Sequence, residues 1–111
     1  MSALELKPSD AARIFAALGD ATRLRLLSRL KDGHARAITE LAVGIGLTRQ
    51  GVSKHLSVLE RAGIVTRRRV GRESRYRARP EAIDSARVYL ERASAQWDET
   101  LSRLEDHLGR D

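Results

Sequence analysis

Residues 47–65, LTRQGVSKHLSVLERAGIV, decide the fold because they predict a helix with two different faces. At about 100° per residue, Val52, Leu56 and Leu59 fall on one narrow apolar stripe. The polar residues fall opposite that stripe or on its flank: Gln50, Ser53, Lys54, Ser57 and Arg61. Glu60 is the only acidic residue of the segment, whereas a solvated helix face usually mixes acids and bases. The polar face therefore favours a negatively charged partner.

This helix has the size and the residue types that read duplex DNA. A helix fits the major groove, where Gln, Lys and Arg side chains hydrogen-bond to base edges and Ser bonds a base or a phosphate. Thr48 is expected to cap the helix, and Thr48 and Arg49 to anchor the DNA backbone, because helix N-terminal amides favour phosphate. A plain solvated face is the alternative. The expected contacts are Thr48, Arg49, Gln50, Ser53, Lys54, Ser57 and Arg61.

Two further residues of the helix have packing explanations. Gly51 lowers helix stability by about 1 kcal/mol relative to alanine, so we expect it to allow close packing against the preceding helix. Close approach of a DNA backbone is the alternative explanation. His55 lies at the edge of the apolar stripe, and we expect it to pack or hydrogen-bond within the protein rather than to contact phosphate.

Seven arginines follow in residues 66–79, TRRRVGRESRYRAR. The runs 64–70 and 74–78 are β-prone and meet around Gly71, which predicts a hairpin. Strand side chains alternate, so these arginines cannot all face one way. Arg69 and Arg72, near the tip, are expected to reach a minor groove or phosphates. Tyr76 is expected to pack beneath the hairpin rather than to stack on a base.

Three shorter helices are predicted before this unit. The first opens at Pro8 with Ser9 as its cap, the second is capped by Asp20 and stops at Gly33, and the third covers residues 37–46. The positions expected to face the core are Ile14, Phe15 and Leu18, then Leu24, Leu27 and Leu30, then Ile38, Leu41, Ala42 and Ile45. With the hairpin and a final helix, this order predicts a mainly α winged helix-turn-helix as a single domain over residues 1–111.

The final helix is predicted from Pro80 to about residue 108. Its apolar residues recur at steps of 3, 4, 3, 4, 4, 3 and 4, close to a heptad seam: Ile83, Ala86, Leu90, Ala93, Trp97, Leu101, Leu104 and Leu108. A 111-residue chain cannot cover so long a stripe alone, so residues 9–18 and 81–108 are expected to form a dimer interface. Its expected anchors are Phe15, Ile83, Leu90, Trp97, Leu101 and Leu104. Intrachain packing of the first two turns, or an effector pocket at Trp97, are alternatives.

Charge is concentrated in the middle of the chain. Residues 49–79 carry 10 Lys and Arg against 2 Asp and Glu, giving +8, while the whole chain carries +6. A basic zone confined to one segment is typical of a protein that binds a polyanion, although a merely soluble surface is the alternative. The absence of cysteine excludes disulfides and thiolate metal sites. Without a signal pattern or an apolar run of ~20 residues, we expect a cytoplasmic protein with no membrane partner.

Three stretches resemble the ArsR/SmtB-type winged-helix repressors: LGDATRLRLLSRL at 18–30, LTRQGVSKHLSVLERAGIVTRRRVGRESRYR at 47–77, and Pro80. The resemblance covers roughly residues 10–108. It implies that the helix at 48–62 reads operator DNA, that the hairpin is the wing, and that the terminal helices build a homodimer. Founding members of that family release DNA when they bind metal.

At the positions where that family binds metal, this chain carries mostly residues that cannot act as metal ligands. By the resemblance, its cysteine positions fall on Ala37 and Thr39, neither a useful ligand for a soft metal. Its ligand positions on the last helix fall on Asp84, Ala86, Trp97 and Thr100, of which only Asp84 can ligate. His34, His55 and His107 show no ligand spacing. The sequence thus resembles the branch without metal sites, and we expect no metal and no cofactor.

Together these features predict a homodimeric, sequence-specific DNA-binding transcriptional regulator that represses from an imperfectly palindromic operator, with an unknown effector. The alternatives are a nonspecific architectural nucleic-acid-binding protein, a winged-helix module for protein interaction, and a metal-responsive repressor with an atypical site. An enzyme is not expected, because the sequence has no nucleophile–base pattern, glycine-rich phosphate loop or metal cluster.

Overall fold

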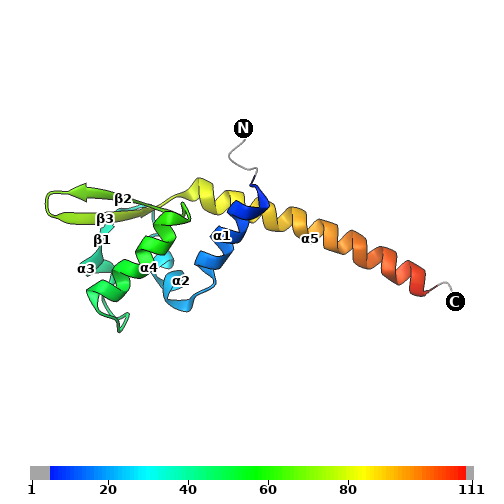
Figure 1. Ribbon diagram of the computed structural model, residues 1–111, viewed down its shortest axis with the longest axis horizontal. Coiled ribbons are helices and arrows are strands. Elements are labelled where there is room, and N and C mark those ends of the chain that lie inside the picture. The colour runs from blue at the N-terminus through cyan, green and yellow to red at the C-terminus, as the bar shows by residue number, and fades with distance from the viewer. Residues whose placement is uncertain (1–5, 110–111) are drawn as a thin grey trace.

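A computed structural model describes residues 6–109 of the chain as a helical head with a hairpin on one side and a long helix on the other (Figure 1). The elements are α1 (Pro8–Leu18), α2 (Ala21–Ser28), β1 (Arg36–Ala37), α3 (Ile38–Leu41), α4 (Arg49–Arg61), β2 (Val65–Val70), β3 (Glu73–Ala78) and α5 (Pro80–Leu108). This order confirms the predicted winged helix-turn-helix, with α4 at the recognition position, β2 and β3 as the wing, and a long last helix.

The apolar stripe of α4 is the centre of the core. Val52, Leu56 and Leu59 are fully buried, as their spacing predicts. The core cluster draws on every short helix and on the sheet, and its other large buried members are Ile14, Leu26, Leu30, Leu41, Ile45, Ile64, Val65 and Tyr76. Burial of Tyr76 beneath the wing confirms the expectation for that residue. Since the core fixes one face of α4, the opposite face is held outward.

Two of the three helix caps predicted from the sequence are present in the structure. The Asp20 side chain accepts a hydrogen bond from the Arg23 backbone N–H at 3.0 Å, and Thr48 Oγ1 accepts one from Gly51 N–H at 3.0 Å. The prediction that Ser9 caps α1 is wrong, because α1 begins at Pro8 and its N-cap is Lys7 without a side-chain bond. Proline suits the first helical position, since its φ is preset and its missing N–H would have no helical partner there.

In α2 the inward face differs from the prediction. Leu24 is 50% exposed rather than buried, and Leu26, which the sequence analysis did not select, is fully buried. Leu27 is half-buried and Leu30 is buried as expected. The reason lies in Arg23, which occupies an inward position: its Nε donates to the Ala17 carbonyl at 2.6 Å. The contacting face of α2 therefore includes Arg23 and Leu26 rather than Leu24.

The region predicted as a third helix over residues 37–46 is partly wrong. Only Ile38–Leu41 is helical, and Arg36–Ala37 forms a short strand that pairs antiparallel with β3, giving the sheet order β1-β3-β2. β1 pairs with the edge of β3 that faces away from β2. In a hairpin alone, the backbone N–H and C=O groups of that edge would be unpaired. Gly44 and Gly46 have positive φ and prevent the helix from continuing. Leu41 and Ile45 are buried and Ile38 and Ala42 half-buried, as expected.

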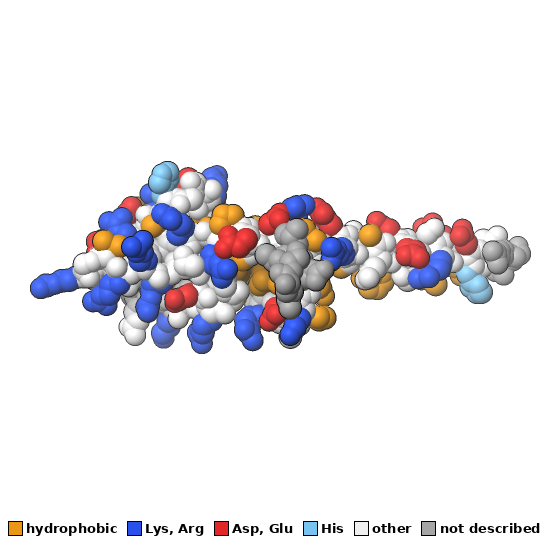
Figure 2. Space-filling view, turned by 90° about the horizontal axis from the view of Figure 1, so that it is seen from above, with side chains coloured by type: hydrophobic (Ala, Val, Ile, Leu, Met, Phe, Trp, Pro, Cys, Tyr) orange, Lys and Arg blue, Asp and Glu red, His pale blue; other side chains and the backbone are white. Residues whose placement is uncertain are grey.

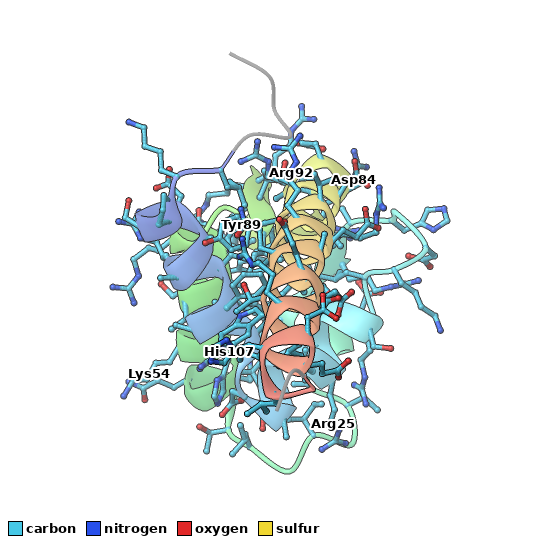
Figure 3. All side chains as sticks on the ribbon, turned by 90° about the vertical axis from the view of Figure 1, so that its right-hand side faces the viewer. Arg25, Lys54, Asp84, Tyr89, Arg92 and His107 are labelled. Atoms are coloured by element: carbon cyan, nitrogen blue, oxygen red, sulfur yellow. The ribbon has the colours of Figure 1, made fainter. Side chains whose placement is uncertain are left out.

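Helix α5 divides into a packed half and a protruding half. Near its start Ser85 and Ala86 are buried, and the Tyr89 ring lies against Phe15 of α1 with centroids 6.0 Å apart (Figure 3). Ala86 is therefore taken up by the chain's own core, contrary to its expected place in the dimer seam. Farther along, the large stripe residues are exposed: Leu90 55%, Trp97 65%, Leu101 49%, Leu104 52% and Leu108 71%. None of the helices in residues 6–109 is long and apolar enough to cross a membrane.

Candidate nucleic-acid interface

The outward face of α4 presents the polar residues that the sequence singled out. Arg49, Gln50 and Lys54 are exposed, and Ser53 lies half-buried on the flank. Lys54 projects away from the rest of the protein (Figure 3). These residues lie in the first half of α4. The inner side of this helix is buried in the core. The arrangement offers hydrogen-bonding groups along one continuous edge, as a helix in a major groove requires.

The orientation of α4 is fixed by a polar network at its inner edge. The Arg23 guanidinium contacts His55 Nδ1 at 3.2 Å, and the Asp20 carboxylate lies 3.7 Å from the same nitrogen. The backbone hydrogen bond from Arg23 lowers the pKa of Asp20, so its carboxylate stays ionised beside these groups. The expectation that His55 bonds within the protein is confirmed. The network ties the end of α1, the start of α2 and the middle of α4 together.

Gly51 has a different neighbour from the one predicted. A Cβ added there would lie 3.4 Å from Thr48 Oγ1 and 3.5 Å from Leu47 Cβ. The close contact is thus with the segment that leads into α4 and not with the third helix, so that prediction is wrong. A Cβ at this position would be in ordinary van der Waals contact with the capping threonine and with Leu47. Approach of a DNA backbone at Gly51 stays a prediction.

The strand register divides the wing arginines between two faces. Arg67 lies opposite Tyr76 and Arg69 opposite Ser74, so both are on the face that turns its base toward the core. Arg67 Nε is 3.9 Å from the Glu60 carboxylate of α4, which partly neutralises it. Arg69 is exposed farther along the same face. The register gives Arg69 the same side as Arg67, but Arg69 also lines the hollow that the arginines of the other face border, and its contact with DNA stays a prediction.

The other face of the wing holds three arginines that the sequence analysis did not select. Arg68 lies directly opposite Arg75, and Arg77 follows on the same side. Together with Thr66, Arg69 and Val70 they line a hollow of about 370 Å³. Arg75 Nη2 reaches Glu73 at 3.2 Å, but its buried Nε has no partner among the described residues. Side chains alternate between the two faces of a strand, so the neighbours of the buried Tyr76 in β3 must face the other way. This alternation could have revealed the second basic face from the sequence.

The tip of the wing and the start of α4 meet at one place. A hollow of about 170 Å³ is lined by both Arg49 and Arg72, together with Thr39, Ser74 and the acidic Glu73. Gly71 turns the hairpin with a φ of 63°, a conformation that glycine adopts without strain. Two residues far apart in sequence, each predicted to touch DNA, thus border the same small space. Figure 2 shows Lys and Arg side chains crowded over this end of the molecule.

Arg61 lies apart from that group. It is exposed at the C-terminal end of α4, where its Nε donates to the Ser57 carbonyl at 3.4 Å. The 13 residues of α4 separate it from Arg49 by about 18 Å at ~1.5 Å per residue. Arg61 instead shares a hollow of about 400 Å³ with Arg13 and Arg23. Arg13 is a basic residue at this end that the sequence analysis did not select.

The candidate metal positions show no cluster of ligands. Asp84 Oδ1 accepts hydrogen bonds from Arg87 at 2.6 and 3.0 Å, and Arg87 also donates to Glu91 at 2.6 Å. Over residues 6–109, no group of three or more His, Cys, Asp or Glu side chains is placed to hold a metal ion. The expectation that the protein does not sense metal stays a prediction, because the effector is not tested by this geometry.

Residues 11–68 match a protein family described as a helix-turn-helix domain. The HTH-type transcriptional regulator CmtR of Mycobacterium tuberculosis is 43% identical over 76 residues, which cover 68% of this chain and 64% of that protein. A probable mercury resistance operon repressor of Streptomyces lividans is 42% identical over 69 residues, or 62% of this chain and 54% of that protein. In both cases this chain spans less than two thirds of the relative.

Solved structures match over more of the chain. An ArsR-like transcriptional regulator from Rhodococcus sp. RHA1 is 36% identical with a TM-score of 0.75, and the match covers 88% of this chain and 92% of that one. The homodimeric winged helix-turn-helix DNA-binding domain of Mb0332 from Mycobacterium bovis, described as a possible ArsR-family regulator, is 32% identical with a TM-score of 0.61. That match covers 86% of this chain and 84% of the Mb0332 domain.

Proposed function

The chain belongs to the ArsR-like family of winged helix-turn-helix transcriptional regulators, and we propose that it acts as a homodimeric, sequence-specific DNA-binding repressor. The observation that carries this proposal is the shared surface of α4 and the wing. Exposed hydrogen-bonding side chains occupy the first half of α4, and Arg49 and Arg72 border one hollow beside them.

On this proposal α4 enters the major groove of the operator. Gln50, Ser53 and Lys54 then bond to base edges, because Gln50 and Lys54 lie opposite the buried stripe and Ser53 on its flank, all in the N-terminal half of the helix. Thr48 and Arg49 hold phosphates, and Ser57 and Arg61 contact the backbone farther along. Arg69 and Arg72 of the wing reach an adjacent minor groove or its phosphates.

Specific binding is favoured over architectural, nonspecific binding by the uncharged groups on α4. The arginines of the wing would be enough for general attraction to phosphates, which is independent of sequence. Gln50 and Ser53 add directional donors and acceptors that phosphate binding does not need. A base-reading role accounts for both sets of residues, whereas an architectural role accounts only for the arginines.

The proposed homodimer follows from the exposed stripe of α5. A two-fold axis would place two α4 helices in successive major grooves, ~34 Å apart, on an imperfectly palindromic operator. The Mb0332 domain is described as homodimeric, which supports the same assembly here. Repression is supported by the name of the Streptomyces relative, a probable operon repressor. A dimer bound over a promoter would repress by blocking access to that DNA.

The signal that releases DNA is not expected to be a metal. The name of the Streptomyces relative refers to mercury resistance, but this chain has no cysteine to supply a thiolate. The family's ligand positions carry Ala37, Thr39, Ala86, Trp97 and Thr100. We therefore propose a regulator that does not respond to a soft metal ion.

Selection of bound fragments from the source genome tests the proposal. The purified protein is incubated with sheared genomic DNA, and the retained fragments are sequenced and footprinted. We expect a shared imperfect palindrome with half-sites about 10 base pairs apart, centre to centre, upstream of genes. Retained fragments that share no sequence would favour the architectural alternative and overturn the assignment of base readout to α4.

A further inference from the structure

The side of the wing that is turned away from the core brings like charges together. This outer face of the wing consists of the residues of β2 and β3 that alternate with the buried Tyr76 and its neighbours: Thr66, Arg68, Val70, Glu73, Arg75 and Arg77. Arg68 lies directly opposite Arg75, and Arg77 is a diagonal neighbour of Arg68. Like charges directly opposite each other destabilise a pair of strands. A bound anion would relieve this repulsion.

Acidic groups do not balance the arginines of the outer face. In residues 6–109, the ion pairs of the wing are Arg75 with Glu73 at 3.2 Å and Arg67 with Glu60 at 3.9 Å. Arg68 and Arg77 have no such partner there. The Nε of Arg75 is buried and lacks a hydrogen-bond acceptor in the described part of the chain. A buried donor without a partner destabilises the folded protein, so this face has a use for an additional acceptor.

The arginines surround a hollow whose size suits a small molecule. Its volume is about 370 Å³, and its lining contains four arginines, the Thr66 hydroxyl and no acidic residue. Sites for small molecules have volumes from about 300 Å³ upwards. Guanidinium groups bind phosphate through paired, charge-assisted hydrogen bonds, and a hydroxyl can donate one more. Four arginines around one hollow favour a ligand with several negative charges.

We propose that the outer face of the wing binds a small molecule that carries two or more phosphate groups. Arg68 and Arg75, one from each strand, hold the first phosphate between them. The next cross-strand pair on this face is Thr66 with Arg77, which holds the second phosphate. The first phosphate also offers the Arg75 guanidinium acceptors beyond its single contact with Glu73.

The position of the hollow separates this ligand from DNA bound to α4. The wing projects from the head (Figure 1), and α4 lies beneath its opposite face, where Arg67 approaches Glu60. The hollow extends from Val70 near the tip to Arg77 and Ala35 at the base of the wing. Arg77 is six residues from Gly71, or about 20 Å along the strand. A duplex seated on α4 would meet the wing at its tip, so the base of the hollow stays open to a free ligand.

The ligand would oppose DNA binding through Arg69. The register gives Arg69 the side opposite to Arg68, yet Arg69 lines the hollow. Because β2 is an edge strand, a long side chain can reach around its open edge to either face. Arg69 is also a DNA contact in the proposed function, and one guanidinium cannot hold both partners fully. This step rests on the proposed function and makes a phosphorylated small molecule the signal that weakens operator binding.

Calorimetric titration of the full chain with inorganic pyrophosphate tests the site in the absence of DNA. At constant ionic strength we expect saturable binding at one site per chain. Arg68→Gln and Arg75→Gln should each weaken it at least about 10-fold, because each removes charge-assisted hydrogen bonds. Arg92→Gln, which removes an exposed arginine of α5, is the matched control and should bind as wild type does. No saturable binding, or the same loss in all three variants, would overturn the proposal.

Thermal unfolding shows whether the variants fold. Loss of one of two opposing like charges should leave the melting temperature unchanged or raise it. Pyrophosphate should raise the melting temperature of the wild type and of Arg92→Gln more than that of Arg75→Gln, because only a folded site binds the ligand. Equal increases in all of these proteins would show binding elsewhere and would contradict the proposed site.

Operator titrations with and without pyrophosphate test the regulatory step. At constant ionic strength, saturating pyrophosphate should weaken operator binding by the wild type about 5-fold or more and leave that of Arg75→Gln nearly unchanged. Pyrophosphate that binds without affecting operator affinity would overturn the regulatory step. If Arg68→Gln and Arg75→Gln weaken binding to every duplex and pyrophosphate does not bind, the hollow holds DNA phosphates and the proposal is wrong. Pyrophosphate binding as expected in a protein without operator preference would support the site and overturn the proposed function.

Discussion

The surface of α4 with the wing and the outer half of α5 are both exposed, but their chemistry is opposite. The first presents Gln, Ser, Lys and many Arg side chains, and residues 49–79 carry a net charge of +8. The second presents leucines and a tryptophan that are about half to two-thirds exposed in one chain. Polar groups lose little by facing water, whereas an apolar stripe of this length is stabilised by burial. The contrast indicates two different partners, a polyanion for the first and a second apolar surface for the second.

Truncation of the α5 stripe should produce the largest effect. Trp97→Ala combined with Leu101→Ala removes two central anchors, and loss of one anchor at an interface typically costs about 2 kcal/mol or more. We expect monomers or unfolded chains by sedimentation, and operator affinity should collapse although α4 is untouched. The matched double variant Gln96→Ala with Ser102→Ala lies off the stripe and should remain dimeric. A Trp97/Leu101 variant that still sediments as a dimer would break the contrast between the two surfaces.

Truncation on α4 should alter specificity without altering assembly. Gln50→Ala should cost about 1–3 kcal/mol on the selected operator and much less on random duplex, because it removes base contacts only. Parallel titrations of both duplexes measure the difference. Ser28→Ala, an exposed serine at the end of α2, serves as a control and should bind as wild type does. Equal losses on both duplexes would remove Gln50 from base recognition.

The cap of α4 should matter more than the expected cap of α1. Thr48→Ala should lower the free energy of unfolding by about 1 kcal/mol, because Thr48 Oγ1 accepts the Gly51 N–H at the start of the helix. Ser9→Ala should leave stability almost unchanged, since Ser9 is exposed and lies inside α1 rather than at its cap. Urea denaturation of both variants measures this. Equal destabilisation would contradict the placement of the two helix starts.

Removal of one wing arginine should weaken all duplexes alike. Arg72→Ala should reduce the salt slope of binding by about one, because one phosphate contact is lost. Titrations of operator and random duplex over a range of salt concentrations would measure the slope. Arg92→Ala, an arginine on α5 away from the wing, should leave the slope unchanged. An altered sequence preference with an unchanged slope would assign Arg72 to base readout instead.

Metal ions should have no effect on operator binding. Binding to operator should be the same with zinc, with arsenite and with a chelator, because the family's ligand positions lack thiolates and imidazoles. A competition assay at fixed protein concentration would detect a change. Loss of operator binding at stoichiometric metal would show an atypical site and revive the metal-responsive alternative.

Sequence reasoning predicted the elements that depend on local pattern. Helix α4 followed from one apolar stripe, and its cap followed from Thr48, because both signals are contained within a few turns. The hairpin followed from Gly71 and the flanking β-prone runs. The long α5 was visible from its repeat, although the burial of Ala86 by the head was not.

What the sequence missed depends on contacts between elements. The inward position of Arg23 shifts the buried face of α2 from Leu24 to Leu26, and it arises from a bond to Ala17 and a contact with His55 that no local pattern encodes. Strand β1 forms because β3 has a free edge beside it, so only the folded sheet reveals it. For the candidate site, the residue types on α4 were readable, but the meeting of Arg49 and Arg72 required the fold.

The ratio of affinities for the selected operator and for a scrambled duplex of the same composition tests the central claim most directly. Both dissociation constants are measured for the wild-type protein at one physiological salt concentration. We predict that the operator binds at least about 10³-fold more tightly, as expected for base readout by α4 in a dimer. Equal affinity for the two duplexes would contradict the account, because attraction of the wing and α4 to phosphates alone would then explain all of the binding.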